Sequence, residues 1–174
     1  MAELQMRIQK ADHAPDIVVI TESWPKNHRF SLNAVEIKIG GYKLFHTPLG
    51  RGRGICTYIK ENLPFKEVKI ESNYEEYLAL TMNLEKGEKL LVMAIYRSPN
   101  SSDDNNEQLI KLLDNINQTG YTHQVILGDF NMPTIDWEND SKQPHGSKIF
   151  GTNYRKLLDA TCENTNKMSR DSNT

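Results

Sequence analysis

The chain of 174 residues has few of the features that mark a secreted or membrane-bound protein. Its two cysteines, Cys56 and Cys162, lie far apart and suggest neither a disulfide framework nor a zinc site. No apolar run approaches the roughly 20 residues that a membrane-spanning helix needs. The polar segment 1–10 also lacks the apolar stretch of a secretory signal. We therefore expect an intracellular protein with no membrane partner, and the sequence does not choose between nucleus and cytoplasm.

The chain also lacks an excess of positive charge. Lysine and arginine number 21 against 23 acidic residues, which gives a net charge of −2. A domain held on DNA mainly by phosphate contacts is usually strongly basic, so the composition counts against tight DNA binding. It does not exclude a hydrolase, because catalytic carboxylates lower the net charge. Segment 51–69 is locally basic and would either contact DNA phosphates or form a solvated face around a strand; its basic residues are Arg51, Arg53, Lys60, Lys66 and Lys69.

Hydrophobic periodicity predicts a single domain of alternating helices and strands. The expected strands are 16–20, 42–46, 55–60, 76–83, 89–96 and 124–127. The expected helices are 2–12, one that is capped by Asp104 with Glu107 three residues on, and one marked by Phe150, Tyr154, Leu157 and Leu158. This order indicates an α/β or α+β fold in which helices cover mixed β-sheets.

Polar residues stand where three of the apolar strands end. Glu22 follows the first strand, Tyr96 ends the strand 89–96, and Asp129 with Asn131 follows the last strand. Ligands often bind at the carboxyl ends of strands in layered α/β folds. Carboxylate and amide oxygens suit Mg²⁺, which often binds through only one or two carboxylates. Each residue taken alone could equally be a turn residue or a half-buried strand aromatic, so the spacing predicts no more than a possible metal site.

Three ordered motifs resemble those of the endonuclease/exonuclease/phosphatase superfamily. Segment 20–24 (Ile-Thr-Glu-Ser-Trp) resembles its metal-ligand segment, and 94–100 (Ala-Ile-Tyr-Arg-Ser-Pro-Asn) resembles its tyrosine loop. Segment 128–131 (Gly-Asp-Phe-Asn) is similar to its Gly-Asp-x-Asn signature. The resemblance covers about residues 3 to 160. It implies a DNase-I-like layered sandwich and metal-dependent hydrolysis of a phosphodiester.

Two further segments resemble one branch of that superfamily. Segment 40–59 is similar to the glycine-rich segment of endonuclease domains from non-LTR (LINE-like) retrotransposons, and so is segment 131–137. This resemblance implies an enzyme that nicks DNA, with a reverse transcriptase domain downstream in a full-length relative. It implies no small-molecule cofactor.

The resemblance also assigns roles residue by residue. Glu22 would be a direct ligand of Mg²⁺, with Mn²⁺ as a possible substitute. Asp129 would orient or deprotonate the attacking water. Asn131 would hold that water or a phosphate oxygen, and Tyr96 would contact the scissile phosphate. Substrate contacts are expected from Asn100, Arg97 and Arg53.

Two elements of the superfamily pattern are missing from this sequence: the asparagine of the first strand and the terminal Ser-Asp-His. We therefore expect an incomplete fold, truncated at both ends. Residues 1–162 would form the partial domain, and 163–174 would be a polar, disordered tail. Loss of catalytic-set members is expected to reduce activity. Two alternatives stay open: an inactive remnant that binds nucleic acid or another partner, and a phosphatase acting on phosphoinositides or other small phosphate esters.

Overall fold

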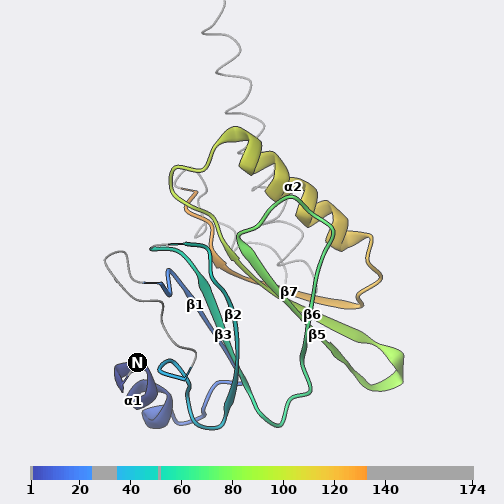
Figure 1. Ribbon diagram of the computed structural model, residues 1–174. Coiled ribbons are helices and arrows are strands. Elements are labelled where there is room, and N and C mark those ends of the chain that lie inside the picture. The colour runs from blue at the N-terminus through green and yellow to red at the C-terminus, as the bar shows by residue number, and fades with distance from the viewer. Residues whose placement is uncertain (1, 25–34, 51, 133–174) are drawn as a thin grey trace, which may run out of the picture.

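The computed structural model describes residues 2–24, 35–50 and 52–132 (Figure 1). Its helices are α1 (Ala2–Lys10) and α2 (Asp103–Asn117), with a short 3-10 turn at Glu85–Gly87. Its strands are β1 (Ile17–Thr21), β2 (Tyr42–Thr47), β3 (Ile55–Lys60), β4 (Lys66–Val68), β5 (Tyr77–Asn83), β6 (Lys89–Tyr96) and β7 (His123–Asp129). The expected helix around Tyr154 and the expected tail lie outside the described residues. Neither described helix has the length and apolar character needed to cross a membrane.

The strands form two sheets. In the three-stranded sheet the order is β1-β3-β2, and all neighbours are antiparallel. In the four-stranded sheet the order is β4-β5-β6-β7; β6 and β7 are parallel, and the other pairs are antiparallel. Parallel neighbours need a long crossover, which α2 supplies between β6 and β7. The prediction of mixed sheet is therefore confirmed.

The two sheets pack face to face around an apolar layer. Alternate residues of each strand point to opposite faces, so Leu78 and Leu80 of β5 meet Ile55 and Ile59 of β3 in this layer, together with Tyr96 of β6. All five of these residues are buried. This layer fixes how the strand ends of one sheet lie against those of the other.

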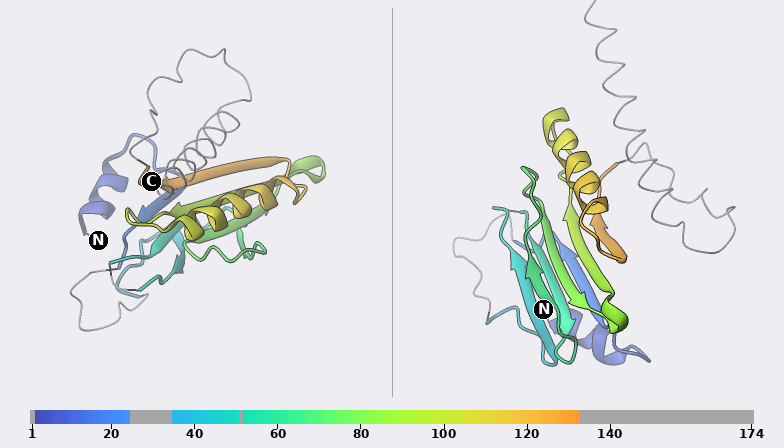
Figure 2. Two further views of the ribbon diagram at one scale, coloured as in Figure 1. Left: turned by 90° about the horizontal axis from the view of Figure 1, so that it is seen from above. Right: turned by 90° about the vertical axis from the view of Figure 1, so that its right-hand side faces the viewer.

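A helix covers the outer face of each sheet. Leu109, Leu112 and Ile116 of α2 pack against Leu91 and Met93 of β6 on the outer face of the four-stranded sheet (Figures 1 and 2). Helix α1 contributes Ile8 to a separate cluster with Cys56 and Tyr58 on the outer face of β3. The result is the layered sandwich of sheets flanked by helices that the sequence predicts.

Two local features differ from the prediction. Strand β4 was not expected, because it has three residues and two of them, Lys66 and Glu67, are exposed and charged. Helix α2 is capped by Ser102 rather than Asp104: the Ser102 hydroxyl accepts a hydrogen bond from the Asn105 backbone N–H. Asp104 lies in the first turn instead, where its negative charge suits the helix dipole.

Candidate active site

The structure brings the tyrosine loop and the Gly-Asp-x-Asn signature together at one end of the four-stranded sheet. Tyr96 and Asp129 are register partners at the ends of the parallel strands β6 and β7. The backbone N–H of Arg97 then donates to the Asp129 carbonyl over 2.8 Å. Two of the three predicted motifs are therefore neighbours because of the parallel pairing.

The third motif joins them through a side-chain hydrogen bond between the sheets. The Tyr96 hydroxyl donates to Glu22 Oε1 over 2.8 Å, although the two residues are 74 positions apart in sequence. Tyr96 is only 2% exposed, whereas Glu22 is exposed to solvent. The carboxylate is thus held in place by a buried phenol while it stays accessible from outside.

Two of the site residues have unusual backbone conformations. Glu22 has φ 51° and Asn131 has φ 46°, both in the left-handed region. Such conformations cost a residue with a side chain about 1–3 kcal/mol, and they cluster at functional sites. The Asp129 side chain stabilises the conformation of Asn131, since its Oδ1 accepts a hydrogen bond from the Asn131 backbone N–H over 3.1 Å. The Asn131 side chain in turn donates to the Arg97 carbonyl over 2.8 Å.

Burial controls the protonation of Tyr96. Loss of hydration raises the pKa of this phenol to about 12, and the hydrogen bond to Glu22 and the negative charges of Glu22 and Glu76 act in the same direction. The phenol therefore stays neutral near neutral pH and serves as a hydrogen-bond donor rather than a base.

This shift predicts a delayed alkaline titration. Burial also raises the pKa of Tyr58 to about 12 and raises the pKa of Tyr74. Because the folded state holds the protons of Tyr58 and Tyr96 more tightly, their contribution to stability is complete below the ordinary tyrosine pKa of 10.0 and is lost as pH rises through about 12. Ultraviolet titration of tyrosinate should show a late fraction that guanidinium abolishes and that Tyr96→Phe reduces. Ionisation of all tyrosines near the ordinary value would contradict this environment.

Arg97 stabilises the turn at 129–131, which carries the Gly-Asp-x-Asn signature and is called the signature turn below. Its Nε donates to Asn106 Oδ1 over 2.8 Å, and its Nη1 donates to the carbonyls of Asn131 and Phe130 over 2.7 and 3.3 Å. The structure therefore shows Arg97 as a support for the turn between Asp129 and Asn131. A substrate contact by this residue stays a prediction, and it would depend on Nη2.

The other two predicted substrate contacts lie in loops. Asn100 is exposed, just before the Ser102 cap of α2. Arg53 lies in the glycine-rich loop, next to Gly54, which packs closely on the segment after β1: a Cβ built on Gly54 would lie 2.9 Å from Ser23 Oγ. The Ser23 backbone N–H donates to the Gly54 carbonyl over 3.2 Å. The glycine-rich loop is therefore fastened beside Glu22.

Sequence reasoning missed Glu76, a buried carboxylate near the site. It accepts hydrogen bonds from Ser98 Oγ over 2.7 Å and from Arg53 Nη1 over 3.0 Å. A signal was present in the spacing, because Glu76 lies two and four residues before Leu78 and Leu80, which face the layer between the sheets, and side chains two apart in a strand share a face. An acid at an inward position calls for a partner.

The side chains at this end of the sheets fit an oxygen-preferring cation. Glu22 and Asp129 offer carboxylate oxygens, and the Asn131 amide keeps its oxygen because its nitrogen donates to Arg97. In the described part of the chain, no group of three or more His, Cys, Asp or Glu side chains gathers to enclose a metal. Carboxylate and amide oxygens are ligands of the kind that Mg²⁺ takes, together with several waters.

Face-to-face sheets with carboxylate, amide and phenol groups at their strand ends define a layered α+β protein with an oxygen-rich candidate site. The chain matches the model of the Endonuclease/Exonuclease/phosphatase family over residues 2–173, and it belongs to that family. Membership supports a hydrolase of phosphodiester or phosphate-ester bonds, and enzymes of this family generally use divalent metals. A comparison with curated proteins found no match.

Proposed function

We propose that this chain is a Mg²⁺-dependent DNA endonuclease of the retrotransposon type, which hydrolyses one phosphodiester and leaves a nick. The observation that supports this proposal is the 2.8 Å hydrogen bond from Tyr96 to Glu22. It ties the predicted metal ligand to the strand end that carries Asp129 and Asn131. The carboxylate and amide oxygens of this group would hold a divalent cation, whose positive charge would attract a phosphate substrate.

Glu22 would hold the metal ion, with the Asn131 amide oxygen as a further ligand or a water contact. When bound, Mg²⁺ or Mn²⁺ polarises a phosphoryl oxygen and stabilises charge on the leaving oxygen. The remaining steps belong to the chain. Asp129 accepts a proton from the attacking water, since Asn131 N–H occupies only its Oδ1. The neutral Tyr96 phenol donates its one hydrogen bond to Glu22 and holds that carboxylate in place. The Asn131 amide gives one N–H to the Arg97 carbonyl, and its second N–H would position the phosphate for in-line attack.

The retrotransposon assignment rests on sequence pattern. Segment 40–59 includes the glycine-rich loop that lies beside Glu22, whereas segment 133–137 is outside the described residues. DNA is then the substrate, and a full-length relative would carry a reverse transcriptase domain downstream. An intracellular location, nuclear or cytoplasmic, is part of the same proposal.

A comparison of two substrates tests the proposal. Purified chain is incubated in Mg²⁺ with supercoiled plasmid and, separately, with a soluble phosphoinositide. We expect open-circular plasmid and no release of phosphate, because a polynucleotide presents a phosphodiester to the site. Phosphate release without nicking would replace the endonuclease with a phosphatase. If a chain that unfolds cooperatively forms neither open-circular plasmid nor free phosphate, both hydrolase activities are excluded and the chain is a non-catalytic member of the family.

A further inference from the structure

Glu76 is a buried carboxylate with an unusually full set of donors. Its Oε1 accepts from Ser98 Oγ and Arg53 Nη1. Its Oε2 accepts at longer range from Tyr74 OH, Asn105 Nδ2 and the Ser98 backbone N–H, over 3.4 to 3.5 Å. Its side chain is only 8% exposed. A buried carboxylate is stable only when hydrogen-bond donors surround it, and the donors at this position match a carboxylate.

Three of these four donor residues come from segments that surround the candidate active site. Arg53 belongs to the glycine-rich loop, Ser98 follows Tyr96 in the tyrosine loop, and Asn105 lies in the first turn of α2. The backbone reinforces the link, because the Tyr96 N–H donates to the Glu76 carbonyl over 2.9 Å. The Tyr74 hydroxyl also donates to the Tyr96 carbonyl over 3.0 Å. Glu76 therefore fixes the glycine-rich loop relative to Tyr96.

Arg53 is the exposed end of this network. Its side chain is 49% exposed, and Glu76 is its one side-chain partner within the described residues. A guanidinium has five N–H donors, and the bond through Nη1 uses one of them. The remaining donors face no acceptor of the described chain and can take a phosphate in two-point fashion.

We propose that Glu76 is a positioning residue that holds the Arg53 guanidinium for a backbone phosphate of DNA beyond the one that is cleaved. This inference rests on the proposed function and adds a source of substrate preference. The scissile phosphate is served by Glu22, Tyr96, Asp129 and Asn131. Arg53 would therefore bind a second phosphate of the DNA backbone, which a small phosphate monoester lacks. Glu76 has two opposite effects on phosphate binding: it orients the Arg53 guanidinium, and its negative charge repels the phosphate. Orientation dominates because four further donor groups share that charge.

Binding of a fluorescein-labelled duplex oligonucleotide, followed by anisotropy in EDTA over a series of salt concentrations, tests the inference without any need for catalysis. We expect Arg53→Ala to weaken binding about tenfold and to lower the salt slope by about one. Glu76→Gln should weaken binding in the same direction but less. The double variant should bind no more weakly than Arg53→Ala, because Glu76 acts through Arg53. Glu75→Gln, an exposed neighbour, is the matched control and should bind like the wild type.

Two further measurements separate positioning from a general effect on the fold. Arg53→Lys keeps the positive charge and loses the planar guanidinium, so it should keep the salt slope of the wild type and still bind more weakly than the wild type. In the nicking assay, Glu76→Gln should raise KM for plasmid and leave kcat unchanged. If Glu76→Gln does not fold, Ser98→Ala removes the 2.7 Å bond, keeps both charges, and should also weaken binding.

The outcomes distinguish this inference from the proposed function. In one outcome the wild-type chain binds DNA, with the losses described for Arg53→Ala and Glu76→Gln, and yet leaves plasmid uncut. That result would overturn the proposed endonuclease activity and support the positioning role of Glu76. Normal binding by Arg53→Ala in a chain that nicks plasmid would overturn the inference alone. Tighter binding by Glu76→Gln would show that its charge, not its orienting effect, dominates, and it would also overturn the inference.

Discussion

We expect Asp129→Asn and Glu22→Gln each to lower the rate of plasmid nicking by about 10²- to 10⁴-fold. Each change keeps the size and one acceptor oxygen of the side chain and removes its charge. The Asn131 N–H can still donate to residue 129, and the Tyr96 hydroxyl can still donate to residue 22. The fold should therefore survive, and the loss should lie in proton acceptance by one residue and metal binding by the other.

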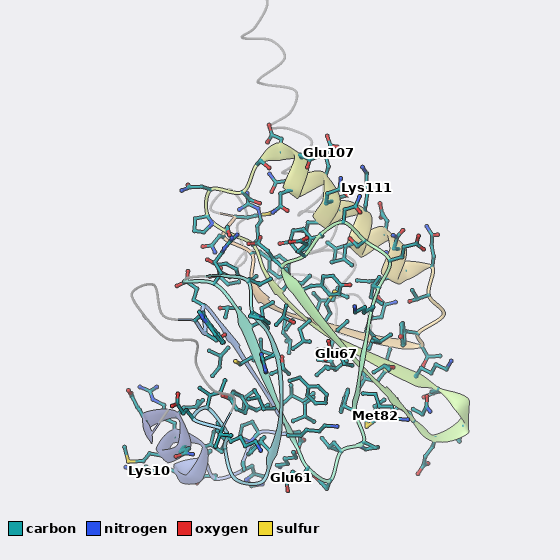
Figure 3. All side chains as sticks on the ribbon, viewed as in Figure 1. Lys10, Glu61, Glu67, Met82, Glu107 and Lys111 are labelled. Carbon is teal, nitrogen blue, oxygen red and sulfur yellow. The ribbon has the colours of Figure 1, made fainter. Side chains whose placement is uncertain are left out.

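Two exposed acids are matched controls for these variants. Glu107 projects from the outer face of α2 (Figure 3), and Asp12 lies just after α1. Glu107→Gln and Asp12→Asn should nick at the wild-type rate. Raising the Mg²⁺ concentration should partly restore Glu22→Gln but not Asp129→Asn, which separates a ligand from a proton acceptor. Wild-type rates in either site variant would remove that residue from the mechanism.

We expect Gly128→Ala to prevent stable folding. A Cβ at this position would lie 1.8 Å from the Ile95 carbonyl oxygen and within 2.9 Å of two more backbone atoms of Ile95. The contact is with the backbone of β6, which is locked between β5 and β7 and cannot turn aside as a side chain would. Gly128 also has φ 144°, a conformation that residues with side chains rarely adopt.

The expected loss is more than about 4 kcal/mol, in the exceptional range for single substitutions. Natural domains have about 5–15 kcal/mol in total, so little or none of the variant should unfold cooperatively. Urea unfolding followed by circular dichroism measures this. Gly40→Ala is the control, because a Cβ there would meet nothing within 4 Å. Equal midpoints for Gly128→Ala and wild type would mean that β6 and β7 do not approach as described.

The regular elements could be predicted because burial leaves a periodic trace. The short, continuously apolar runs of β5 and β6 and the apolar face of α2 identify those elements to within a few residues. Strand β4 leaves almost no trace, since pairing with β5 rather than burial defines it. The α2 cap was misplaced because Ser102, Asp103 and Asp104 are all acceptable near a helix start, and only geometry selects Ser102.

The candidate site was predicted as a set of residues but not as an arrangement. Glu22, Tyr96 and Asp129 stand at strand ends, which a sequence can indicate. The Tyr96–Glu22 bond joins two different sheets, so it depends on how those sheets face each other. Arg97 illustrates the same limit. Its type and position suggest a phosphate contact, whereas the structure shows its guanidinium donating to the carbonyls of the signature turn.

The central claim is that this end of the two sheets hydrolyses DNA phosphodiesters with a divalent metal. The most direct test is to follow nicking of supercoiled plasmid by the wild-type chain in Mg²⁺, in EDTA, and in EDTA followed by excess Mg²⁺. We predict open-circular product in the first and third conditions and none in the second. Equal nicking in EDTA, or no nicking in Mg²⁺ by a chain that unfolds cooperatively, would contradict the claim.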